Sequence, residues 1–83
     1  MAKLVWKIAE EGKDHEVSLD YSMVLGKAII KIDGDSFDIS TGPFRLRGTS
    51  QVFRLGESQA IINFPSRGKP TIVFDGETVD PEK

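Results

Sequence analysis

His15 is the residue of this chain best suited to acid–base chemistry, because an unperturbed imidazole titrates near neutral pH. The chain has one histidine and no cysteine, which excludes clusters of imidazoles and metal sites built on thiolates. His15 could serve as a ligand or as a general base. No serine or cysteine nucleophile motif accompanies it, so we predict instead a structural histidine whose ring packs at the rim of the fold.

Two groups of carboxylates could bind a calcium ion through their oxygens. Neither group has the spacing of a calcium-binding loop, and each contains an Asp-Gly pair that suits a tight turn. Turn formation is the interpretation we favour, and we expect no metal or other cofactor. The sequence also lacks phosphate-binding and nucleophile motifs, so we predict that the protein is not an enzyme. The groups are Asp33, Asp35 and Asp38, and Asp75, Glu77 and Asp80.

Arginine is concentrated in residues 44–74, which hold five basic side chains against a single acidic one. If strands at residues 44–47 and 52–55 pair as a hairpin, Arg45, Arg47 and Arg54 gather on one exposed face. Such a face could bind an anionic ligand, a nucleic acid or an acidic protein. It could equally be a solvated surface that keeps the protein soluble. The neighbouring phenylalanines are predicted to point inward, which leaves no platform for stacking bases, so nucleic acid is the less favoured partner.

Charge and hydropathy predict a cytoplasmic protein with no membrane partner. The formal net charge is −2, which does not favour bulk binding to nucleic acid or to a membrane. No run approaches the roughly eighteen apolar residues that a spanning helix needs. The first residues contain no apolar stretch of the kind found in secretion signals.

Apolar and polar residues alternate along most of the chain, which is typical of half-buried antiparallel strands. Such stretches recur about every eight to twelve residues with turn residues between them, and this predicts an all-β sandwich or barrel. The 83 residues allow one domain, 1–83, with an ordered core over about residues 3–80. The predicted stretches lie at residues 4–8, 15–21, 28–32, 37–39, 44–47, 52–55, 60–64, 72–74 and around 79.

Two Asp-Gly pairs predict hairpins with two-residue type I′ turns, because both central residues of that turn have positive φ. The first, Asp33-Gly34, sets a register in which apolar residues face the same side. All seven aromatic side chains also fall at positions assigned to the core. The predicted pairs are Ile30 with Phe37 and Ala28 with Ile39, and the aromatic residues are Trp6, Tyr21, Phe37, Phe44, Phe53, Phe64 and Phe74.

The chain contains an internal repeat. Residues 26–38 align with residues 68–80 at an offset of 42, and residues 17–21 align with residues 60–64 at an offset of 43. We interpret the repeat as two similar β-meanders packed face to face, which gives an antiparallel β-sandwich of seven to eight short strands. The alternative is that favourable hairpins resemble one another without a shared origin.

Four apolar residues occupy positions that should face outward, namely Val5, Ile29, Ile61 and Val73, and the last three are candidate interaction residues. If they cluster, they form a patch for a protein partner or for self-association. If they are scattered, they are ordinary surface residues.

Several motifs occur in an order that resembles a known family. Val5-Trp6 opens the first strand, and the second Asp-Gly hairpin ends the match, which covers about residues 4–79. Between them stand His15-x-Val17-x-Leu19, Gly26-Lys27-x-x-Ile30-x-Ile32-Asp33-Gly34, Phe44-Arg45-Leu46-x-Gly48, Phe53-x-Leu55-Gly56 and Ala60-x-Ile62-x-Phe64.

The chain thereby resembles one domain of the Fas apoptotic inhibitory molecule family. The resemblance implies a β-sandwich and a role in modulating death-receptor signalling or in protection against aggregation. We therefore expect a non-enzymatic protein-interaction or regulatory module that binds another protein, or itself, through a sheet face or an edge strand. The alternative is a small β-domain that binds anions or nucleic acid through Arg45, Arg47 and Arg54.

Overall fold

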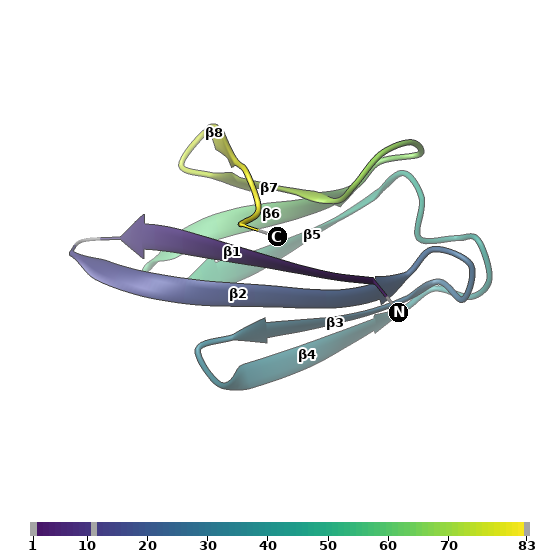
Figure 1. The fold of residues 1–83 in the computed structure, drawn as a ribbon, viewed down its shortest axis with the longest axis horizontal. Coiled ribbons are helices and arrows are strands. Elements are labelled where there is room, and N and C mark those ends of the chain that lie inside the picture. The colour runs from purple at the N-terminus through teal and green to yellow at the C-terminus, as the bar shows by residue number, and fades with distance from the viewer. Residues whose placement is uncertain (1, 11, 83) are drawn as a thin grey trace.

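The protein is an all-β domain of two antiparallel sheets that pack face to face (Figure 1). The computed structural model describes residues 2–10 and 12–82 of the chain. The first sheet, here called sheet A, has the order β1-β2-β3-β4, and the second, sheet B, has the order β5-β6-β7-β8. Sheet A contains β1 (Ala2–Glu10), β2 (Lys13–Ser22), β3 (Lys27–Ile32) and β4 (Asp35–Ser40), and sheet B contains β5 (Thr49–Leu55), β6 (Ser58–Phe64), β7 (Thr71–Phe74) and β8 (Glu77–Val79).

Each sheet is a simple meander in which every strand pairs with the next one along the chain. The predicted architecture of two similar meanders is confirmed. The eight-residue segment 41–48 is the connection between the sheets. Within the described part of the chain, no helix is long and apolar enough to cross a membrane.

The first Asp-Gly hairpin has the predicted register. Asp33 and Gly34 have φ values of 48° and 96°, as a type I′ turn requires. The second hairpin repeats this geometry, with φ values of 53° at Asp75 and 80° at Gly76. Both predicted pairs are present in sheet A, namely Ile30 with Phe37 and Ala28 with Ile39.

The inward-facing residues of the two sheets form one shared core. Trp6, from β1, is its largest fully buried side chain, and the core contains residues of both sheets. No polar or charged residue among those described is fully buried, so burial of apolar area is the main source of stability. The other fully enclosed large side chains include Leu19, Ile30, Leu46, Leu55, Ile62, Phe64 and Ile72.

The strand predicted at residues 44–47 does not exist, and Phe44 does not point into the core. Residues 41–48 form an irregular loop in which Leu46 is buried but Phe44 is 59% exposed with a φ of 62°. The physical reason is that this segment must carry the chain from one sheet to the other, and it cannot also pair as a strand. The other six aromatic residues lie in the core or pack against it, as predicted.

The crossing loop is fixed to the β2–β3 turn by a close backbone approach at Gly26. The Thr41 amide donates to the Gly26 carbonyl at 2.8 Å, and a Cβ added at Gly26 would lie 1.7 Å from the Gly42 carbonyl oxygen. Gly26 also has a φ of 69°. Only glycine fits such a position without displacing the loop.

We therefore expect Gly26→Ala to destabilise the protein more than Gly76→Ala. Both positions have positive φ, but a Cβ at Gly76 meets no atom within 4 Å. The φ strain alone should cost about 1 kcal/mol at either site, and the clash at Gly26 should add about 2 kcal/mol or more. Urea unfolding of the two variants measures the difference in free energy. Equal losses would show that the loop does not depend on this contact.

Candidate functional site

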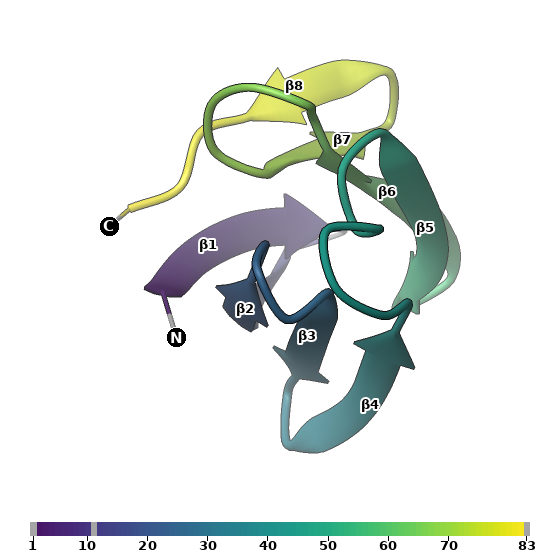
Figure 2. The same cartoon turned by 90° about the vertical axis from the view of Figure 1, so that its right-hand side faces the viewer.

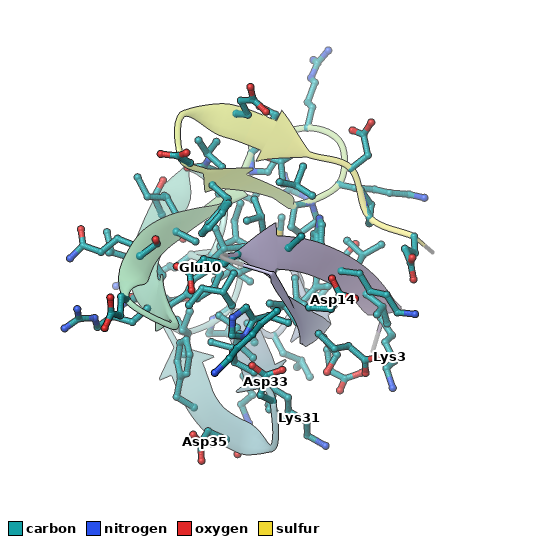
Figure 3. The ribbon with its side chains drawn as sticks, turned by 90° about the vertical axis from the view of Figure 1, so that its left-hand side faces the viewer. Lys3, Glu10, Asp14, Lys31, Asp33 and Asp35 are labelled. Carbon is teal, nitrogen blue, oxygen red and sulfur yellow. The ribbon has the colours of Figure 1, made fainter. Side chains whose placement is uncertain are left out.

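His15 is held between the carboxylates of Glu10 and Asp33. Figure 3 labels these two carboxylates at the end of the molecule that carries the tight hairpins. Its Nδ1 lies 2.5 Å from Oδ2 of Asp33, and its Nε2 lies 3.6 Å from Oε1 of Glu10. The His15 side chain is 12% exposed and that of Glu10 is 9% exposed. We call these three residues the rim cluster.

The rim cluster joins three hairpins. Asp33 belongs to the β3–β4 turn, and its second oxygen accepts a hydrogen bond from the Glu16 amide of β2 at 3.1 Å. Glu10 ends β1, and its carboxylate lies beside sheet B, where hydrogen bonding by Ser58 and by the Glu57 backbone lowers its pKa. Its Oε1 fills the space beside Gly56, so that a Cβ there would come within 2.0 Å of it.

The cluster stabilises a protonated imidazole. The hydrogen bond to Asp33 raises the pKa of His15 above its ordinary value, and the nearby charge of Glu10 adds to the effect. The same hydrogen bond lowers the pKa of Asp33, and hydrogen bonding by Ser58 lowers the pKa of Glu10. The His15 Nε2 and the Glu10 Oε2 are buried and make no hydrogen bond to any described residue. The approach of His15 Nε2 to Glu10 Oε1 is therefore an attraction of charges when His15 is protonated, and this attraction is lost when the imidazole is neutral.

An imidazolium between two carboxylates is suited to joining structural elements and poorly suited to acting as a base. Both ring nitrogens already face an acceptor, which leaves no free lone pair for a substrate proton. Among residues 2–10 and 12–82, no group of three or more His, Asp or Glu side chains converges as a metal site requires. The structure thus places His15 at the rim, where the sequence predicts a structural histidine.

The stabilisation provided by the cluster should be largest between about pH 4.5 and 6.5. The raised pKa of His15 stabilises the folded state fully below the ordinary histidine value of 6.5, and this contribution is lost as the pH rises through the raised value. The lowered pKa values of Asp33 and Glu10 stabilise above the ordinary carboxylate values of 3.8 and 4.5, and that contribution is lost in acid.

Asp33→Asn tests this pH dependence, because Asn-Gly also favours the type I′ turn and retains an oxygen for the Glu16 amide. We expect the pKa of His15, measured by NMR titration, to fall toward its ordinary value in this variant. The difference in melting temperature from the wild type should be largest near pH 5–6 and should shrink above the His15 pKa. An unchanged His15 pKa would contradict the proposed role of Asp33.

The three candidate arginines do not form the predicted face. Arg45 and Arg47 lie in the crossing loop, whereas Arg54 lies near the far end of β5. All three are exposed. From Thr49 to Arg54 the strand extends about 17 Å, so the three guanidinium groups cannot converge on one small anion. The predicted arrangement is wrong because it required the absent strand at residues 44–47.

The three candidate apolar residues are divided between the two outer faces. Ile61 pairs with Val73 on β7 and with Val52 on β5, so these side chains form a row across the outer face of sheet B. Ile29 pairs with Asp20 and Asp38 on sheet A, where it is isolated among carboxylates. The structure therefore supports an apolar row on sheet B that includes Ile61 and Val73 but excludes Ile29.

The edge strands of the two sheets adjoin in two places, β1 beside β8 and β4 beside β5, and we call these two places the seams. Hydrogen bonds bridge the seam between β1 and β8. The Trp6 indole donates to the Val79 carbonyl at 3.1 Å. The chain then continues past β8, and the Glu82 amide donates to the Val5 carbonyl at 2.7 Å. The edge of β1 is thus covered by the last described residues of the chain, which Figure 2 shows curving toward β1.

The seam between β4 and β5 is equivalent in register but is not bridged in this way. Trp6 lies opposite Val17 and Phe53 lies opposite Ala60, and the repeat aligns Val17 with Ala60. By the same reasoning Phe37 on β4 corresponds to Val79 on β8. The rings of Phe37 and Phe53 have centroids 6.5 Å apart and make the contact equivalent to that between Trp6 and Val79. No backbone hydrogen bond joins β4 to β5 in the described ranges.

We expect Trp6→Phe to loosen the bridged seam. The variant keeps an aromatic ring but loses the hydrogen bond to Val79, which should cost about 1–3 kcal/mol because the buried carbonyl is left without its partner. Urea unfolding followed by circular dichroism measures the stability, and hydrogen exchange reports the amides of β8. Unchanged exchange in β8 would show that the indole does not hold this strand.

The open seam forms a groove of about 600 Å³ between β4 and β5. Phe37 lines one side, Val52 and Phe53 line the other, and His15 and Asp33 of the rim cluster lie at one end. Sequence reasoning missed the role of Val52, because nothing in the local pattern distinguishes an edge strand from a central one. It also missed Glu10, although this residue has the same parity along β1 as the buried Ile8.

No known family matches. Comparisons with protein-family models, with curated proteins and with solved structures found no similar protein. The resemblance to the Fas apoptotic inhibitory molecule family remains a prediction from the sequence.

Proposed function

We propose that the protein is a non-enzymatic interaction module that binds an extended segment of a partner protein along the free edge of β5. The observation that carries this proposal is the difference between the two equivalent seams. On one seam the chain covers its own edge, because the Glu82 amide donates to the Val5 carbonyl. On the other seam the corresponding position is free.

Val52 is the residue on β5 that corresponds to Val5. Val5 lies opposite Ser18 and Val52 lies opposite Ile61, and the repeat aligns these two partners. The Val52 carbonyl accepts a hydrogen bond from the Gln51 side-chain amide at 3.3 Å, and no backbone amide of the crossing loop or the turns reaches it in the described part of the chain. A side-chain amide is easily displaced, so an incoming backbone amide can take its place.

The other three edge strands carry features that discourage pairing with foreign chains. The edge of β1 is covered by the tail, and β8 has only three residues and is followed closely by Pro81. β4 presents the exposed carboxylates of Asp35 and Asp38. By contrast, β5 has seven residues with no proline or glycine and with Arg54 as its one charge.

The geometry favours a single extended segment over a folded partner. The groove is lined on both sides, by Phe37 on β4 and by Val52 and Phe53 on β5, which leaves room for one chain beside β5. Alternate side chains of that chain would face the two rings, so an apolar residue is preferred there. Capture of extended segments is compatible with the protection against aggregation that the family resemblance implies.

Selection of short random peptides displayed on phage tests the proposal. We expect enriched peptides to contain apolar residues at alternate positions and to shift the NMR signals of Ser50, Val52 and Arg54. Val52→Pro removes the amide on the free edge and should weaken binding about tenfold or more, because one backbone hydrogen bond and the strand register are lost. Val52→Thr is the matched control, since it retains the amide and the branched shape.

Two outcomes would overturn the proposal. Peptides that bind both Val52 variants equally well would place the binding site elsewhere. A dimer detected by light scattering, and converted to a monomer by Val52→Pro, would show that the edge serves a second copy of this chain rather than a partner protein.

A further inference from the structure

Three loops lie together at the end of the molecule opposite the rim cluster (Figure 2). They are residues 23–26 between β2 and β3, residues 41–48 between the sheets, and residues 65–70 between β6 and β7. Hydrogen bonds join the first two loops to each other and the second loop to the end of β6, where the third loop begins. The Phe44 amide donates to the Val24 carbonyl at 3.1 Å, and the Gly48 amide donates to the Phe64 carbonyl at 2.6 Å. We call this end the loop end.

The loop end exposes most of the large apolar side chains that the structure leaves in water. Val24, Leu25 and Phe44 are 58%, 52% and 59% exposed. The hydrogen bond between Phe44 and Val24 places these residues side by side. Phe44 also has a positive φ, which is rare for a bulky side chain and is typical of positions where strain has a functional use. The strained backbone holds an aromatic ring outside the core.

The charges of the molecule are separated along its long axis. The three loops carry Arg45, Arg47, Arg67 and Lys69 and contain no acidic residue. At the opposite end, the hairpins carry mainly carboxylates. The acidic residues there are Glu10, Asp14, Asp33, Asp35, Glu57, Asp75 and Glu77, and Figure 3 labels four of them at this end.

We propose that the loop end docks on the surface of an anionic lipid bilayer. The exposed apolar side chains enter the headgroup region, and the four cations around them meet the lipid phosphates and carboxylates. The acidic hairpins point away from the surface, so that the long axis stands upright on it. This proposal replaces the expectation of no membrane partner, which rested on the net charge of the whole chain, because four cations are gathered at one end. No membrane-spanning segment is needed for this mode of binding, and it does not involve the β5 edge.

The shape of the loop end favours a bilayer over an acidic protein. Val24, Leu25 and Phe44 are each more than half exposed, and they line none of the four grooves found between strands or at the hairpin end. These apolar side chains project from the tips of loops. A fluid headgroup layer accepts such tips, whereas a folded partner would need a pocket built to match them.

Flotation of the full chain with lipid vesicles tests the proposal. We expect binding to vesicles of phosphatidylcholine mixed with phosphatidylserine, and little binding to phosphatidylcholine alone. Binding should weaken as salt is added, because exposed charges are screened.

Matched variants separate the loop end from the rest of the surface. Arg47→Glu should weaken binding about tenfold or more, whereas Arg54→Glu makes the same charge change at the other end and should have little effect. Phe44→Asn should weaken binding to a similar degree, and Ile61→Asn, at an exposed apolar residue outside the loop end, serves as its control. Asparagine tolerates positive φ well, so Phe44→Asn is expected to fold at least as stably as the wild type.

Each other result overturns the proposal. Failure to float with acidic vesicles excludes a bilayer as the partner. Equal losses in Arg47→Glu and Arg54→Glu would show attraction to the whole molecule rather than to the loop end. Binding to soluble poly-glutamate that requires Phe44, without binding to vesicles, would identify an acidic protein as the partner instead.

Discussion

Each sheet of this protein can bury its apolar face only against the other sheet, and the rest of the structure depends on that constraint. A four-stranded meander of this size leaves one face open to water and is not stable alone. With no cysteine for a disulfide, the shared core must supply the stability. Trp6 is its largest fully buried side chain. The conformation of the single crossing loop is therefore constrained, because the loop must place sheet B so that its apolar face packs on that of sheet A.

Apolar packing alone does not fix how the two sheets are aligned at their ends and seams. Polar groups fix that alignment. The rim cluster ties three hairpins together at one end through His15. Backbone hydrogen bonds around Gly26 fix the crossing loop at the other end. One seam is joined by the indole of Trp6 and by the tail, so the β5 edge remains as the long free edge on the described part of the chain. Of the two unpaired edges at the open seam, β4 carries exposed carboxylates, and β5 is the proposed binding edge.

The sequence predicted the features that depend on local residues. The turn at Asp33 and Gly34 needs no information from outside the hairpin, and it sets the register of β4 against β3. Features that depend on contacts between the sheets were not predictable in this way. The alternation around Phe44 suggests a strand, but the need to change sheets overrides it. Glu10 was recoverable in principle, because an acid at an inward position of a strand requires a partner nearby. The free edge at Val52 could not be inferred, because it depends on which strands become neighbours.

The internal repeat has a consequence for how the two seams came to differ. Two identical half-length chains, packed about a twofold axis, would have to carry the same residue at both seams, since every substitution would appear twice. A tryptophan at one position and a phenylalanine at its equivalent are possible only because both halves belong to one polypeptide. Because the two halves are joined in one chain, the residues at the two seams can differ. One seam can be closed by hydrogen bonds while the other stays open, and a single mutation affects only one seam.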